Sequence, residues 1–96
     1  MVDRFEAWVC SYQDWLTTNG VSVEFVKREV AVAILETPEF VSSITVWDIG
    51  ACDIDMVSVE TGISFFAQRY DFDSFDQILP VLEDMRWRIV RSPKTN

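Results

Sequence analysis

The chain has 96 residues, 49% of them hydrophobic, which predicts one small globular domain, residues 1–96, with a real hydrophobic core. Sixteen acidic residues against eight basic ones give a net charge of −8, which argues against a nucleic acid or an anionic membrane as the partner. All sixteen acids but only four of the bases lie within residues 1–85. This charge favours a basic partner protein, although it would serve solubility alone equally well.

Several chemistries need residues that this sequence does not contain. The chain has no His, the commonest general base, and its two cysteines, Cys10 and Cys52, form no C-x-x-C pair. We therefore expect free thiols, no metal, no cofactor, no small-molecule substrate and no catalytic activity. The longest apolar run, residues 30–35, is too short to cross a bilayer, and residues 1–8 lack the regions of a signal peptide, so we expect a cytoplasmic protein.

The first predicted element is an amphipathic helix at about residues 4–18. Its apolar side chains recur at the spacing of one helix face and are Phe5, Trp8, Val9, Tyr12, Trp15 and Leu16. Asp3 and Glu6 have the spacing of a capping box at the helix start, and Asn19-Gly20 ends the helix. We expect Trp8 in the core and Cys10 partly exposed.

Two strands are predicted next, at residues 21–26 and 29–36. Lys27-Arg28 would be the turn between them, with a bulge or a longer irregular connection as the alternative. Residues 30–35 are apolar on both faces, which is typical of a central strand. Thr37-Pro38-Glu39 forms the following turn, because Pro38 blocks further pairing in the sheet.

Residues 42–70 predict three further antiparallel strands, with tight turns at residues 49–51 and at Thr61-Gly62. In the register that we expect, Val46 lies opposite Ile54, and Met56 lies opposite Ala67. Alternation then gives a core face with Ile44, Val46, Ile54, Met56, Ile63, Phe65 and Ala67. The solvent face carries Thr45, Trp47, Asp53, Asp55, Val57, Phe66, Gln68 and Tyr70. A slip of one residue would exchange the two faces.

The last predicted element is a helix at about residues 74–88, with Ser74 and Gln77 at capping-box spacing. Pro80 conflicts with a helix that starts at Ser74, so we expect either a kink or a regular part that begins near Gln77. Residues 89–96 are expected to form a flexible tail. The predicted fold class is α+β: an antiparallel meander sheet of four to five strands with the N-terminal and C-terminal helices packed on one face.

The solvent face mixes aromatic rings with carboxylates, and such exposed clusters mark contact surfaces. The candidate contact residues are Trp47, Asp48, Asp53, Asp55, Phe66, Gln68 and Tyr70. A loop, the tail or a second copy of the chain could instead cover the aromatic rings. Asp53 and Asp55 could also act as a catalytic or cation-binding pair, although two neighbours on an open sheet supply few oxygen ligands.

The run from Ile44 to Gly50, then Asp53, then Val59-Glu60-Thr61-Gly62, resembles the TriTu-type immunity proteins. The opening helix with Phe5 and Trp8 and the closing Leu79-x-x-Leu82 helix are also similar to that family. The resemblance covers roughly residues 5–88, and Pro80 departs from the family's pattern.

The resemblance implies an antidote made by bacteria that deliver an Rhs-type polymorphic toxin through a type VI secretion system. The toxin, TreTu, is an ADP-ribosyltransferase that uses NAD to modify the translation factor EF-Tu. The antidote binds the toxin domain, expected as a 1:1 heterodimer, and blocks its active site, and the seven contact residues would then be toxin-binding. The alternative is an acidic secretion-system chaperone that binds an effector protein, which a stable dimer in sedimentation would favour.

Overall fold

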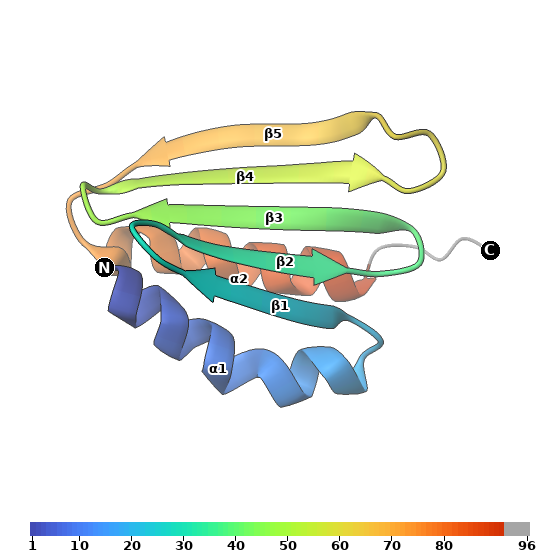
Figure 1. Cartoon of the computed structure of the whole chain (residues 1–96), viewed down its shortest axis with the longest axis horizontal. Helices are drawn as coiled ribbons and strands as arrows, with labels where there is room; N and C mark the ends of the chain where they lie inside the picture. Colours follow the sequence, from blue (N-terminus) through green and yellow to red (C-terminus); the bar gives the residue numbers. More distant parts are fainter. Residues whose placement is uncertain (92–96) are drawn as a thin grey trace.

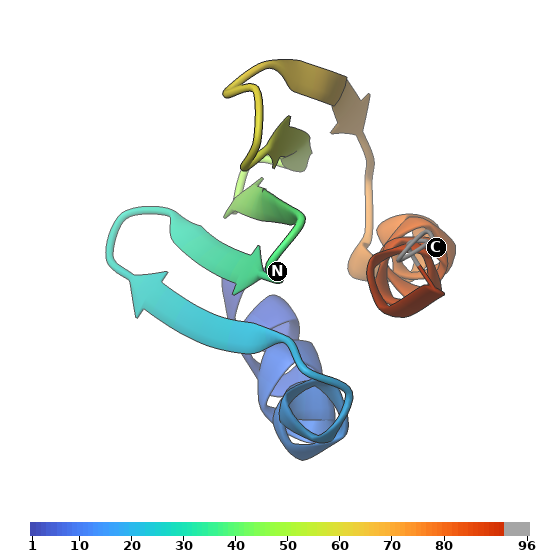
Figure 2. The same ribbon diagram turned by 90° about the vertical axis from the view of Figure 1, so that its right-hand side faces the viewer.

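The computed structural model describes residues 1–91 (Figure 1). It consists of α1 (Val2–Thr18), β1 (Ser22–Lys27), β2 (Ala31–Glu36), β3 (Phe40–Trp47), β4 (Ala51–Ser58), β5 (Ser64–Asp71) and α2 (Phe75–Arg91). The five strands form one antiparallel sheet in the order β1-β2-β3-β4-β5. Figure 2 shows both helices on the same side of this sheet. The predicted α+β meander with two helices on one face is therefore confirmed.

The core lies between the sheet and the helices. Along β3, side chains alternate strictly between buried and half-buried, and Phe40, Ile44 and Val46 belong to the buried set. They share one hydrophobic cluster with residues of both helices. Trp8 and Ile54 are buried, as predicted.

The start of α1 differs from the predicted capping box. Asp3 and Glu6 both accept hydrogen bonds from the Nζ of Lys27, at 2.6 and 3.1 Å, instead of capping the helix. The backbone N–H of Val2 donates to the Oδ1 of Asp48 at 2.9 Å. Asp48, in the turn between β3 and β4, therefore satisfies a free amide of the helix start from a distant part of the chain.

The second helix begins at Phe75 and continues through Pro80. It therefore starts before Gln77, where one of the two predicted alternatives placed the beginning of its regular part. The Oε1 of Gln77 accepts a hydrogen bond from the backbone N–H of Asp73 at 2.6 Å, one residue before the predicted cap. The helix also runs past residue 88, and Ile89 is buried in the core. Of the tail predicted at residues 89–96, residues 89–91 belong to α2, and residues 92–96 lie outside the described residues.

A buried arginine joins the two helices. The guanidinium carbon of Arg86 lies 4.0 Å from the ring centre of Tyr12 and 4.4 Å from that of Trp15. Glu83 accepts hydrogen bonds from Arg86, at 2.6 Å, and from the Nε1 of Trp8, at 2.8 Å. Burial opposes the charged form of Glu83, but these hydrogen bonds outweigh burial and hold the pKa of the carboxyl below its usual value.

The register of β3 with β4 is shifted from the predicted one by two residues. Ile44 lies opposite Ile54, and Val46 opposite Cys52, because the turn is formed by residues 48–50. A shift of two residues preserves the faces, so Trp47, Asp53 and Asp55 remain on the solvent side as predicted.

The register of β4 with β5 is shifted by one residue, and here the prediction is wrong. Met56 lies opposite Phe66 and Val57 opposite Ser64, with a bulge that leaves Phe65 as an extra residue on β5. The faces of β5 are therefore exchanged. Phe66, Gln68 and Tyr70 lie on the helix side, and Ala67 moves to the solvent side.

Candidate functional site

We define the open face as the side of the sheet that faces away from α1 and α2 (Figure 2). The strand pairings place its residues in cross-strand rows. One row consists of Val26, Val32, Thr45, Asp53 and Arg69. The next consists of Glu24, Ile34, Ser43, Asp55 and Ala67. The carboxylates of Asp53 and Asp55 and the guanidinium of Arg69 lie on β4 and β5, whereas β1 and β2 carry mostly apolar side chains and the carboxylate of Glu24.

The most specific feature of the open face is a cluster around Arg69. Its guanidinium carbon lies 5.4 Å from the ring centre of Trp47, within the range of a cation–π contact. Its Nη1 lies 3.4 Å from the Oδ1 of Asp53, and its Nε lies 3.7 Å from the Oδ1 of Asp71. The Asp53 and Arg69 side chains are 45% and 52% exposed, so this ion pair is weak and a partner's cation could replace Arg69 at little cost.

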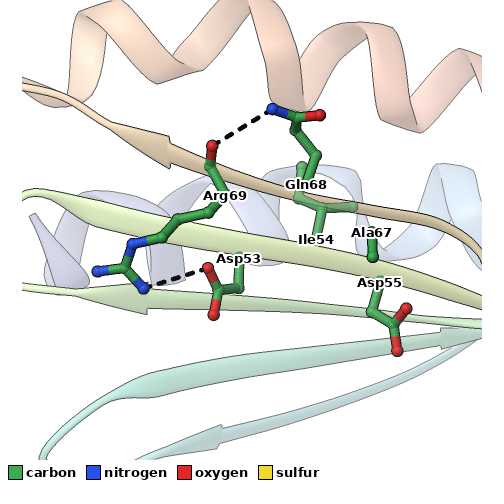
Figure 3. Close-up of a pocket in the computed structure, with 6 residues that line it drawn as sticks. All are labelled: Asp53, Ile54, Asp55, Ala67, Gln68 and Arg69. Atoms are coloured by element: carbon green, nitrogen blue, oxygen red, sulfur yellow. Dashed lines mark hydrogen bonds and ion pairs between the residues drawn. The ribbon is translucent and has the colours of Figure 1, made fainter.

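A shallow hollow lies beside this cluster, between β4 and β5. It is lined by Asp53, Ile54, Asp55, Ala67, Gln68 and Arg69. Figure 3 shows the carboxylates of Asp53 and Asp55 on the side opposite to Gln68, which points toward the helix side. Asp55 accepts a hydrogen bond from the Oγ of Ser64 at 2.6 Å. Ala67, which lies opposite Asp55 on β5, contributes a small side chain to the lining of the hollow.

The strands that form most of the open face come from a long stretch of sequence in which every charged side chain is acidic. Residues 29–68 contain seven carboxylates and no Lys or Arg. Among the described residues, Arg69 is the one base on the open face. The open face therefore offers an aromatic ring and several acceptors of charge-assisted hydrogen bonds, a combination suited to Arg or Lys side chains of another protein.

The structure does not bring all seven candidate residues together. Trp47, Asp53 and Asp55 share the open face. Asp48 accepts a hydrogen bond from the backbone N–H of Val2 at the start of α1, and this bond holds the pKa of its carboxyl below the usual value. The other three, Phe66, Gln68 and Tyr70, lie on the helix side, and Arg88 of α2 lies 5.3 Å from the ring centre of Phe66.

Arg69 was missed by sequence reasoning. The predicted register places it on the core face, where an unpaired charge is costly. The burial of this charge indicates that the predicted pairing of β4 with β5 is wrong by one residue, because a shift of β5 by one residue returns Arg69 to solvent.

Other kinds of site find no support among residues 1–91. They contain no group of three or more His, Cys, Asp or Glu side chains arranged to hold a metal ion. Their helices include none that is long and apolar enough to span a membrane. Cys10 is exposed and Cys52 buried, both are free thiols, and burial raises the pKa of the Cys52 thiol to about 12.

The fold defines a small acidic α+β protein whose sheet leaves one face, with Trp47, Asp53 and Asp55, uncovered by the two helices. Comparison with known families gives a match to the family described as Immunity protein TriTu over residues 3–86. Because this match covers most of the chain, the protein belongs to the TriTu family of immunity proteins. A search of curated proteins found none that matches the chain.

Proposed function

We propose that this immunity protein neutralises a cognate ADP-ribosyltransferase toxin that targets EF-Tu. It would act in the cytoplasm, by forming a 1:1 complex with the toxin domain and blocking its active site. Membership of an immunity-protein family supports this function over the chaperone alternative. The resemblance to TriTu-type antidotes supports the identity of the toxin, its type VI delivery and the blocking of its active site.

The observation that carries the proposal is the open face. Neither helix covers it, yet it presents Trp47 with Asp53 in the adjoining cross-strand row and Asp55 in the row beyond. A half-buried Trp is a frequent anchor of protein interfaces, because it removes a large apolar area from water at a low cost in side-chain entropy. We therefore assign Trp47 as the anchor of the complex.

The carboxylates of the open face would orient the bound toxin and raise the rate of association. We propose that Asp53 and Asp55 receive Arg or Lys side chains of the toxin in the hollow over Ala67. Opposite charges also steer the approach of two proteins and raise the association rate. Phe66, Gln68 and Tyr70 lie on the other side of β5, so a partner seated on the open face would not reach them without wrapping around that edge.

The direct test is an inhibition assay. A TreTu-type ADP-ribosyltransferase domain is incubated with NAD and EF-Tu, and the modified EF-Tu is quantified with and without this protein. We expect modification to stop near one equivalent of the protein. Unchanged modification at a large excess would refute the proposed function.

A further inference from the structure

The hairpin tip between β4 and β5, which we define as residues 58–65, carries large apolar side chains in solvent. Val59 is 53% exposed, Ile63 is 64% exposed and Phe65 is 56% exposed. The tip lies at the right-hand end of the sheet in Figure 1, and neither helix covers it in Figures 1 and 2. Exposed apolar side chains gathered on one short segment indicate a contact site.

Hydrogen bonds hold the tip in one shape. The N–H of Gly62 donates to the carbonyl of Ser58 at 2.8 Å, and the N–H of Ser58 donates to the carbonyl of Ile63 at 3.0 Å. The N–H of Val59 donates to the carbonyl of Glu39 at 3.0 Å, which ties the tip to the start of β3. A segment fixed in this way loses little entropy when it enters a partner.

The charge around the tip selects the kind of partner. Glu39 and Glu60 are exposed there. Arg88, which lies 5.3 Å from the ring centre of the neighbouring Phe66, is paired with Asp84. A surface of apolar side chains with carboxylates beside them fits a crevice that is apolar inside and basic at its rim.

The tip is also continuous with the open face. Val57 and Ser64 form a pair at the base of the tip, and the Oγ of Ser64 donates to Asp55 on the open face. A protein seated on the open face therefore reaches the tip without crossing either helix.

From these features we propose that the hairpin tip is a second contact element, which inserts Val59 and Ile63 into an apolar, basic-rimmed crevice of the cognate toxin domain. This inference rests on the proposed function, since it assigns a further part of the same complex. Truncated apolar anchors mainly raise the dissociation rate, whereas surface charges mainly act on association. The two parts of the interface are thus separable by kinetics.

The test compares a Val59→Ser/Ile63→Ser double variant with the single variant Ile49→Ser. Ile49 is 85% exposed in the turn between β3 and β4, at the opposite end of the sheet, and serves as the matched control. A catalytically inactive variant of the same TreTu-type toxin domain is the probe. Thermal unfolding and sedimentation of each variant show that it is folded and report its oligomeric state.

We expect the double variant to dissociate at least about tenfold faster at low and at high salt, and Ile49→Ser to match the wild type. Wild-type kinetics in a folded double variant would overturn the tip assignment while leaving the proposed function intact. An equally faster dissociation of Ile49→Ser would also overturn it. So would a dimeric wild type that becomes monomeric in the double variant, because the tip would then be a self-association surface. A wild-type protein that does not bind the toxin domain would refute both proposals.

Discussion

Arg69 lies across the indole ring of Trp47, with 5.4 Å between its guanidinium carbon and the ring centre, and connects that ring to Asp53. The contact joins β3 to β5 across β4. It holds the guanidinium of Arg69 against the aromatic ring and partly neutralises the carboxylate of Asp53, which we assign to toxin binding. Replacing Arg69 and replacing Asp53 should therefore have opposite effects on association.

Asp53→Asn should slow association with the toxin domain, and Arg69→Gln should accelerate it. The first change removes a negative charge that attracts a basic partner, and the second removes the positive charge beside it. Stopped-flow or surface-based kinetics at several salt concentrations measure both rates. The association rates of the two variants should approach that of the wild type as the salt concentration rises, because exposed charges are then screened. Rate changes of the same sign would contradict a basic contact surface on the toxin.

Trp8→Ala should lower the free energy of unfolding by about 3–5 kcal/mol, as a large-to-small change in a core. Trp8 is buried, stacks near Phe5 and donates its Nε1–H to Glu83. A loss of this size would remove much of the stability of so small a domain. Chemical denaturation measures the change. A midpoint close to that of the wild type would show that Trp8 contributes little to the core.

Gly50→Ala should destabilise the protein more than Gly62→Ala. Both glycines have a positive φ, +98° and +71°, so each alanine variant incurs a backbone cost of about 1–2 kcal/mol. A Cβ on Gly50 would also collide with the backbone carbonyl of Phe72, whereas a Cβ on Gly62 meets open space. Gly50→Ala should therefore lower the free energy of unfolding by about 3 kcal/mol or more. Equal unfolding midpoints for the two variants would show that this contact relaxes freely.

Glu83→Gln should destabilise the protein most above about pH 5, and the difference should shrink in acid. The folded protein holds the pKa of Glu83 below its ordinary value of 4.5, so the carboxylate stabilises the fold above that value and loses this effect as the pH falls through the folded pKa. Urea denaturation of both proteins at neutral and acidic pH measures the difference. A difference that stays constant with pH would show that the charge of Glu83 is not what stabilises the fold.

The two helices and the meander sheet could be predicted because their signals are local. The apolar spacing from Phe5 to Leu16 fixes one face of a helix, and the turn glycines separate short β-rich runs. The burial of Trp8 and Ile54 follows from the same patterns.

The faces of β5 could not be predicted with the same rules. One bulge at Phe65 moves Phe66, Gln68 and Tyr70 to the helix side. The sequence indicates this bulge only indirectly, because the register without it places the charge of Arg69 in the core. The role of Asp48 depends on a contact with Val2, 46 positions away in the sequence. Of the candidate site, Trp47, Asp53 and Asp55 were placed correctly on one face, because an error of two residues preserves the alternation.

The most direct test of the central proposal, that the open face binds the toxin, is the affinity of Trp47→Ala for the toxin domain. Trp87→Ala is the matched control, since Trp87 is 42% exposed on α2, on the other side of the sheet. Calorimetric titration with the inactive toxin domain should show a loss of about 2–4 kcal/mol for Trp47→Ala and little change for Trp87→Ala, both proteins being folded. Wild-type affinity in Trp47→Ala, or an equal loss in Trp87→Ala, would contradict the open face as the toxin-binding surface.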